Sequence, residues 1–136
     1  MNAAVRYFTK GGNTKKVADA IAEAIGAEAK SIDCPLEEKV DVLFLGNSVY
    51  AANMDKEVKD FVTENKDKIG KLVNVSTAAL IESTYGRMSK LCQELGIEID
   101  EREFHCKGSF KFMHKGRPDE QDLADAKAFA KEIVVG

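Results

Sequence analysis

Short apolar runs alternate along the chain with segments in which apolar residues recur every three or four positions, and this alternation constrains the fold most strongly. The apolar runs predict strands near residues 3–8, 27–32, 40–45, 72–75 and 97–104. The periodic segments between and after them predict helices whose apolar faces lie on residues 17–25, 58–62, 88–95 and 123–133. Strands that alternate with helices in this way form a parallel sheet covered on both sides. The sequence therefore predicts an α/β fold in three layers, with a doubly wound five-stranded parallel sheet.

Length and composition indicate a soluble single domain spanning residues 1–136. A net charge of −3 argues against a nucleic-acid-binding protein, which needs a basic face. The apolar runs are too short to span a membrane, and the amino-terminal residues lack the pattern of a signal peptide. The three cysteines form no CxxC pair, so we expect free, buried or half-buried thiols and a cytoplasmic protein.

A glycine-containing loop follows the first predicted strand and leads directly into the first predicted helix. In a doubly wound sheet, ligands bind at this edge, outside the carboxyl ends of the strands. Glycines let backbone N–H groups turn toward an anion, and a helix amino terminus favours negative charge. The loop matches neither the Walker pattern nor GxGxxG, which leaves the phosphate of a mononucleotide as the predicted ligand. The candidate phosphate-binding residues are Thr9, Lys10, Gly11, Gly12, Asn13 and Thr14.

This loop resembles the phosphate-binding loop of the flavodoxins, usually written Ser/Thr-x-Thr-Gly-x-Thr, and the resemblance extends over essentially the whole chain. It implies a flavodoxin-like fold with strand order 2-1-3-4-5, FMN as cofactor, and no catalytic or metal-binding residue. The chain is similar to short flavodoxins, which lack the extra loop that splits the fifth strand of longer members. Gly11 stands where that pattern has Thr or Ser, so one hydroxyl is missing, although the N–H of Gly11 is retained.

The same resemblance assigns the loops after the third and fourth strands to the isoalloxazine ring of FMN. In the first of them, Tyr50 matches the position of an aromatic residue that stacks on the ring. In the second, small residues suit a close approach of the backbone to the edge of the ring. The candidate ring-binding residues are Ser48, Val49, Tyr50, Ala51, Ser76, Thr77, Ala78 and Ala79.

Three functions remain open at the level of the sequence. The first, which we favour, is a monomeric electron carrier that shuttles one or two electrons between a reductase and an acceptor protein. The second is a small FMN-dependent enzyme that reduces a quinone or another acceptor with NAD(P)H. The third is a flavodoxin-like module that no longer binds FMN and acts in protein interaction. A basic segment that contains Lys107, Lys111, Lys115 and Arg117 is a candidate docking surface for a partner.

Overall fold

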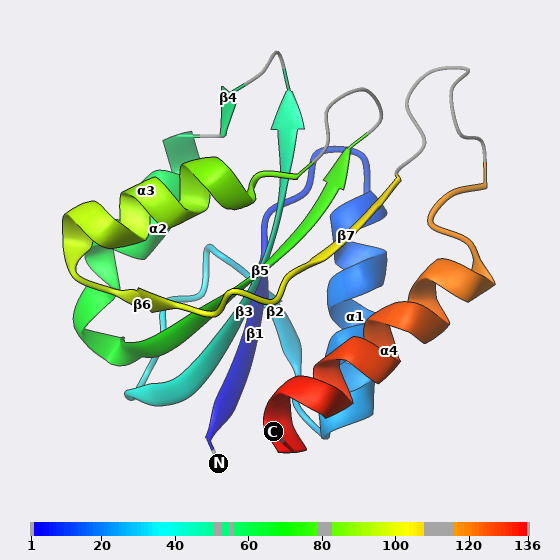
Figure 1. The fold of residues 1–136 in the computed structure, drawn as a ribbon, viewed down its shortest axis with the longest axis horizontal. Helices are drawn as coiled ribbons and strands as arrows, with labels where there is room; N and C mark the ends of the chain where they lie inside the picture. Colours follow the sequence, from blue (N-terminus) through cyan, green and yellow to red (C-terminus); the bar gives the residue numbers. More distant parts are fainter. Residues whose placement is uncertain (1, 51–52, 55, 79–82, 108–115, 136) are drawn as a thin grey trace.

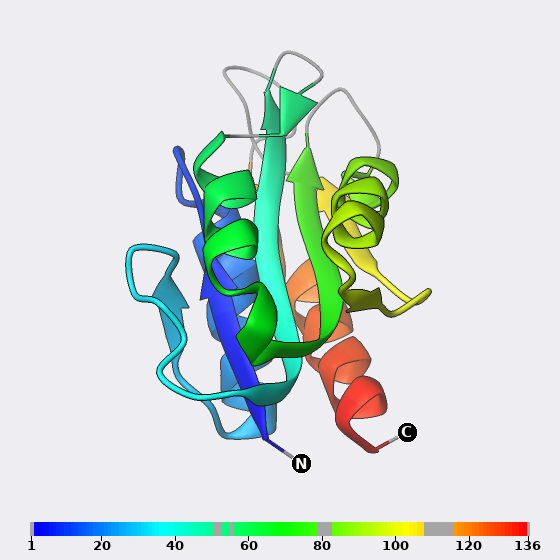
Figure 2. The ribbon, with the colours of Figure 1, turned by 90° about the vertical axis from the view of Figure 1, so that its left-hand side faces the viewer.

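The central element is a twisted parallel sheet, seen edge-on and face-on in Figures 1 and 2. The computed structural model describes residues 2–50, 53–54, 56–78, 83–107 and 116–135. The parallel strands are β1 (Ala3–Tyr7), β2 (Ala29–Ser31), β3 (Val40–Tyr50), β5 (Ile69–Ala78), β6 (Glu98–Ile99) and β7 (Phe104–Lys107). They are arranged in the order β2-β1-β3-β5-β6, with β7 also paired to β5. Because β6 and β7 together form the fifth strand, the predicted order 2-1-3-4-5 is confirmed.

Helices cover both faces of the sheet, as the apolar pattern predicts. The helices are α1 (Asn13–Ile25), α2 (Lys56–Glu64), α3 (Tyr85–Leu95) and α4 (Glu120–Val135), with a short 3-10 turn at Lys66–Lys68. Alternate residues of β3 point to opposite layers: Phe44 packs with α1 and α4, whereas Leu43 and Leu45 pack with α2 and α3. The central strand is apolar on both faces for this reason. Within the described part of the chain, no helix is long and apolar enough to cross a bilayer.

The third strand continues further than its apolar run. Gly46–Tyr50, which the sequence analysis treats as a loop, belongs to β3, and β4 (Asn53–Met54) pairs with its end in antiparallel fashion. The extension is polar, but it stays hydrogen-bonded to β5, with Ser48 opposite Thr77. A strand needs backbone partners more than apolar side chains, so its carboxyl end escapes a search based on hydrophobicity.

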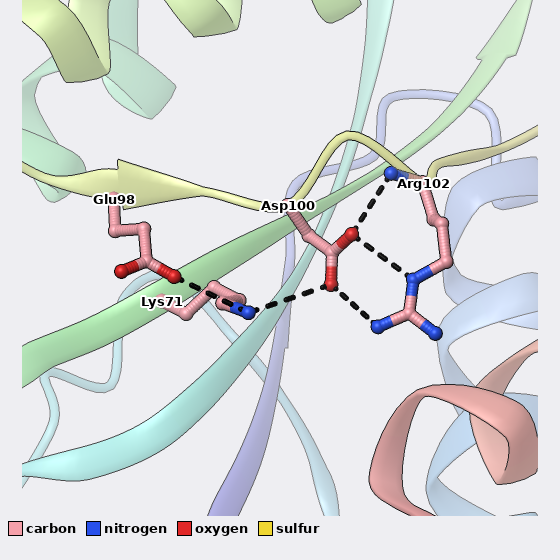
Figure 3. A network of polar contacts seen from close by, with 4 residues as sticks. All are labelled: Lys71, Glu98, Asp100 and Arg102. Atoms are coloured by element: carbon pink, nitrogen blue, oxygen red, sulfur yellow. Dashed lines mark hydrogen bonds and ion pairs between the residues drawn. The ribbon is translucent and has the colours of Figure 1, made fainter. Parts of the chain in front are cut away.

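The fifth strand is interrupted, and the prediction of one continuous strand over residues 97–104 is wrong. The break lies between β6 and β7, at Asp100 and Arg102 (Figure 3). The carboxylate of Asp100 accepts hydrogen bonds from the backbone N–H of Arg102 at 2.9 Å and from its Nε and Nη2 at 3.1 and 2.9 Å. Lys71 Nζ lies 3.9 Å from the same carboxylate and 3.2 Å from Glu98. A side chain that binds the backbone two residues ahead competes with the strand, which explains the break.

We expect Asp100→Asn to destabilise the protein in a pH-dependent way. Asp100 is 7% exposed, and the hydrogen bonds from Arg102 are the main reason that its pKa lies below its ordinary value of 3.8. A lowered pKa stabilises the fold at pH values above the ordinary pKa, and this contribution disappears as the pH falls through the lowered value. The variant should lose about 1 kcal/mol of unfolding free energy at pH 7 and progressively less below about pH 4.

Urea unfolding of the wild type and of Asp100→Asn between pH 7 and pH 3 measures this difference. Glu98→Gln serves as the control, because its carboxylate is largely exposed and its loss should change little. A difference between Asp100→Asn and the wild type that stays constant across the whole range contradicts the role assigned to the Asp100 charge.

Candidate functional site

The loop from β1 to α1 is shaped around the amino terminus of the helix. The backbone N–H of Gly12 donates to Thr9 Oγ1 at 2.8 Å, which closes the loop. Gly12 has a φ of +91° and precedes the helix without a side-chain capping bond, and the first turn of α1 contains no acidic residue. Most helices receive a capping oxygen or an acidic side chain at this end. The first turn of α1 therefore presents its N–H groups and its positive dipole end where an anion can bind.

Lys15 lies in the first turn of α1, where the helix dipole disfavours a positive charge. Lys15 Nζ forms an ion pair with Asp19 at 2.8 Å, one turn further along the helix, and lies 6.0 Å from the centre of the Tyr7 ring. Part of the unfavourable interaction between Lys15 and the helix dipole is thus offset within α1 itself.

Thr14 joins the helix start to the sheet beneath it. Its side chain is 1% exposed, and its Oγ1 lies 2.9 Å from Oγ1 of Thr77 at the end of β5. Gly46 of β3 makes room for this contact: a Cβ there would lie 2.9 Å from Thr14 Cγ2 and 3.3 Å from Tyr7 Cβ. The structure therefore brings together two candidate residues that are 63 positions apart in the chain.

Ser48 contributes a buried hydroxyl on the same side of the sheet. It lies opposite Thr77 in the register of β3 and β5, and strand alternation places it on the face that α1 covers. It is 5% exposed, yet its Oγ finds no hydrogen-bond partner in the described ranges. A buried polar atom without a partner is rare and unfavourable, so this hydroxyl points to a ligand that completes its bonding.

A second group of buried polar residues, absent from the candidates predicted from the sequence, lies on the opposite face of the sheet. Asn47, Asn74 and Thr84 are all 0% exposed and are hydrogen-bonded to one another. Asn47 follows the apolar run of the third predicted strand, and Asn74 interrupts the apolar run of the fourth. Two asparagines at neighbouring strand ends are the available signal in the sequence.

The loop before α1 and the carboxyl ends of β3 and β5, which hold other described candidates, lie at the same edge of the sheet (Figure 1). Lys10 and Gly11 belong to the loop before α1, whereas Val49, Tyr50 and Ala78 lie in the last residues of their strands. Ala51 and Ala79 fall outside the described residues. Ser76 Oγ lies 3.2 Å from Nδ1 of His105 in β7.

A cavity of about 500 Å³ opens beside β7, and the guanidinium of Arg117 in its lining is paired with a carboxylate. Arg117, a candidate docking residue, binds Asp122 through Nε at 2.5 Å and through Nη2 at 2.8 Å. It is therefore not a free charge for a partner protein. Lys107 is exposed, and Lys111 and Lys115 lie outside the described residues. No group of three or more potential metal ligands occurs among the residues described.

The three cysteines differ in burial. Cys34 is exposed, contrary to the expectation of burial, whereas Cys92 and Cys106 are buried, and all three are free. Burial raises the pKa of Cys92 to about 11 and that of Cys106 to about 12, with Asp122 contributing to the latter. A thiol with such a pKa is protonated at pH 8 and unreactive as a nucleophile.

We therefore expect a thiol reagent at pH 8 to label only Cys34 in the native protein. Mass spectrometry should find a single modification before unfolding, none in Cys34→Ser, and labelling of all cysteines in denaturant. Rapid labelling of Cys106 in the native state contradicts its burial.

Comparison with known proteins places these features in a family. Residues 4–95 match the family model described as a flavodoxin domain. The uncharacterized protein MJ0298 of Methanocaldococcus jannaschii is 30% identical over 90% of both chains. A flavodoxin from the domain Archaea superposes with a TM-score of 0.76 at 18% identity, covering 98% of this chain and 96% of its own. Oxidised Flavodoxin 1 from Bacillus cereus gives 0.72 at 21% identity, covering 98% and 97%.

Proposed function

The chain belongs to the flavodoxin family, and on this basis we propose that it binds FMN and carries electrons between redox partner proteins. The observation that carries this proposal is the buried hydroxyl of Ser48, which has no hydrogen-bond partner among the described residues, together with an amino terminus of α1 that lacks a side-chain cap. When bound, FMN supplies one- and two-electron redox chemistry. The residues described above hold and orient it.

In this proposal, the phosphate of FMN lies at the first turn of α1. Backbone N–H groups at the first turn of α1, other than that of Gly12, donate to its oxygens, and the positive end of the helix dipole offsets its charge. The Thr9 hydroxyl closes the loop on Gly12, and the Thr14 hydroxyl is held in place by Thr77. Ser48, which the sequence analysis assigns to the ring, is here assigned to the phosphate instead: its Oγ donates to the same phosphate from β3, which gives the buried hydroxyl a partner.

The ring is assigned to the ends of β3 and β5. Val49, Tyr50 and Ala51 follow Ser48 on one side, and Thr77, Ala78 and Ala79 follow Ser76 on the other. The two strands are neighbours in the sheet, so both segments leave it at the same edge. Backbone groups from both strand ends would then hold the ring.

The Ser48→Ala variant distinguishes an effect on FMN binding from an effect on the stability of the apoprotein. Because the hydroxyl has no partner among the described residues, its removal should leave the stability of the apoprotein unchanged or raise it by about 0.5 kcal/mol. The same change should raise the dissociation constant of FMN about tenfold, through loss of one charge-assisted hydrogen bond. Riboflavin, which lacks the phosphate, should bind the variant and the wild type equally.

Fluorescence titration with FMN and with riboflavin, combined with urea unfolding of the apoprotein, gives these three quantities. A Ser48→Ala variant that is clearly less stable as the apoprotein, or that binds FMN as tightly as the wild type does, contradicts the role assigned to Ser48.

An electron carrier exchanges electrons with partner proteins, whereas a reductase enzyme takes them from NADH or NADPH. We propose that a reductase protein reduces the bound FMN and an acceptor protein oxidises it, with the monomer diffusing between them. The FMN-loaded protein should therefore oxidise NADH or NADPH in the presence of a quinone no faster than free FMN does. Turnover well above that of free FMN makes the protein an enzyme instead.

A further inference from the structure

Three buried polar side chains form a chain of hydrogen bonds from β3 through β5 to the start of α3. Asn47 Nδ2 donates to Asn74 Oδ1 at 2.9 Å, and Asn74 Nδ2 donates to Thr84 Oγ1 at 2.9 Å. Asn47 Nδ2 also lies 3.0 Å from the carbonyl oxygen of Leu45 and 3.2 Å from that of Val75. We refer to Asn47, Asn74 and Thr84 as the Asn–Asn–Thr cluster.

The Asn–Asn–Thr cluster stabilises the fold less than apolar residues at the same positions would. Burying amides is unfavourable unless every polar atom is paired, and Asn47 Oδ1 finds no partner in the part of the chain described. Thr84 precedes α3, where a threonine hydroxyl normally caps the helix, but its side chain makes no capping bond and instead binds Asn74. Apolar residues at these positions would pack without such losses. The cluster therefore points to a need for defined geometry at this place.

Its location indicates which geometry it defines. Asn47 lies two residues before Val49, the first proposed ring-binding residue of β3, and Asn74 lies three residues before Thr77, the first of β5. Thr84 closes the connection from β5 to α3. Strand alternation places the cluster on the face covered by α2 and α3, whereas Thr14, Ser48 and Thr77 lie on the α1 face. The ring and phosphate parts of the site thus have separate supports on opposite faces of the sheet.

We propose that the Asn–Asn–Thr cluster is a positioning device for the isoalloxazine ring, an inference that rests on the proposed FMN function. The cluster fixes the start of α3 relative to the ends of β3 and β5, which flank the ring in that proposal. None of its three residues needs to touch the ring. Each acts by holding the backbone that does so.

A matched pair of variants at one position tests this role. Thr84→Val preserves the shape of the side chain but removes the hydroxyl, which leaves Asn74 Nδ2 without its acceptor, whereas Thr84→Ser retains the hydroxyl. Thr63→Val is the control, since it makes the same change on α2, where the hydroxyl donates to the Lys59 carbonyl at an exposed position. Dissociation constants of FMN and riboflavin are measured by fluorescence at a temperature where all apoproteins are fully folded by circular dichroism.

Thr84→Val should raise the dissociation constants of FMN and of riboflavin by the same factor, about tenfold. The factor is the same because the residues that bind the phosphate are unchanged. Thr84→Val should also shift the visible absorption maximum of bound FMN, and Thr84→Ser and Thr63→Val should match the wild type in both respects. If Thr84→Val does not fold, Asn74→Leu/Thr84→Val replaces both partners with apolar groups and provides the same comparison.

The outcomes separate this proposal from the one on which it rests. Folded Thr84→Val that binds both flavins with wild-type affinity and spectrum overturns the positioning role, since a purely structural residue changes stability alone. Weakening of FMN with no change for riboflavin also overturns it. A wild-type protein that binds neither flavin overturns the proposed function itself.

Discussion

Gly46→Ala should raise the dissociation constant of FMN about a hundredfold, equivalent to about 2.7 kcal/mol. The new methyl group would lie 2.9 Å from Thr14 Cγ2 and 3.3 Å from Tyr7 Cβ, so one of these neighbours has to move. Thr14 is β-branched, buried, and bonded to Thr77, so its methyl group cannot rotate away without breaking that bond. The strain therefore displaces the first turn of α1 from the sheet, together with the N–H groups assigned to the phosphate.

Gly11→Ala provides the matched control for this prediction. A Cβ at Gly11 has no described atom within 4 Å, and the substitution retains the backbone N–H. We expect a change of no more than about threefold in the affinity for FMN. Fluorescence titration measures the dissociation constant of FMN for both variants. Equal affinities, or a Gly46→Ala variant that binds FMN as tightly as the wild type does, contradict the proposed binding site of the phosphate.

Gly70→Ala should produce the largest loss of stability, about 3 kcal/mol, or roughly 10 °C in Tm. A Cβ at Gly70 would lie 2.8 Å from the carbonyl oxygens of both Val40 and Asp41. These atoms belong to the backbone of β3, which pairs with β5 at this point and cannot move aside as a side chain can. Relief of the clash requires the two central strands to separate locally.

Gly86→Ala is the opposing control, because its position in α3 is open, with no described atom within 4 Å of a Cβ. Alanine favours a helix over glycine, so this variant should gain about 0.5 kcal/mol. Thermal and urea unfolding of the two apoproteins should therefore show shifts of opposite sign. A Gly70→Ala variant as stable as the wild type contradicts the close approach of β3 and β5.

Local patterns in the sequence predict most of the fold. The run from Val40 to Leu45 is apolar at nearly every position because α1 and α4 cover one face and α2 and α3 the other. Gly26 and Gly96 end their helices in the left-handed conformation, as their positions after periodic segments indicate. Both features are marked by residues that lie close together in the sequence, which is the range over which a sequence pattern carries information.

The interrupted fifth strand shows where such patterns fail. Residues 97–104 alternate as a strand does, but Asp100 binds the backbone of Arg102 and its guanidinium, and this local competition breaks the ladder. The alternating pattern does not indicate that the Asp100 side chain binds the backbone of Arg102. Lys71 of the neighbouring strand lies 3.9 Å from the same carboxylate, a contact between positions far apart in the sequence.

The candidate site was only partly accessible from the sequence for a related reason. The loop before α1 is local, and the sequence predicts its position at the edge of the sheet. Whether Thr14 meets Thr77, or Asn47 meets Asn74, depends on the register of β3 and β5 and on the packing of the helices. Such contacts arise between distant positions, so a single sequence without the fold does not reveal them.

The visible absorption spectrum of the purified wild-type protein, mixed with FMN and freed of excess by gel filtration, tests the proposed function most directly. If the phosphate and ring sites are preformed, the protein should retain about one FMN per chain. Its spectrum should be that of a flavin, altered from the spectrum of free FMN. Riboflavin, which lacks the phosphate, should bind more weakly than FMN. A colourless protein that also fails to quench FMN fluorescence in a titration contradicts the proposal, and leaves the flavodoxin fold to serve another purpose in this chain.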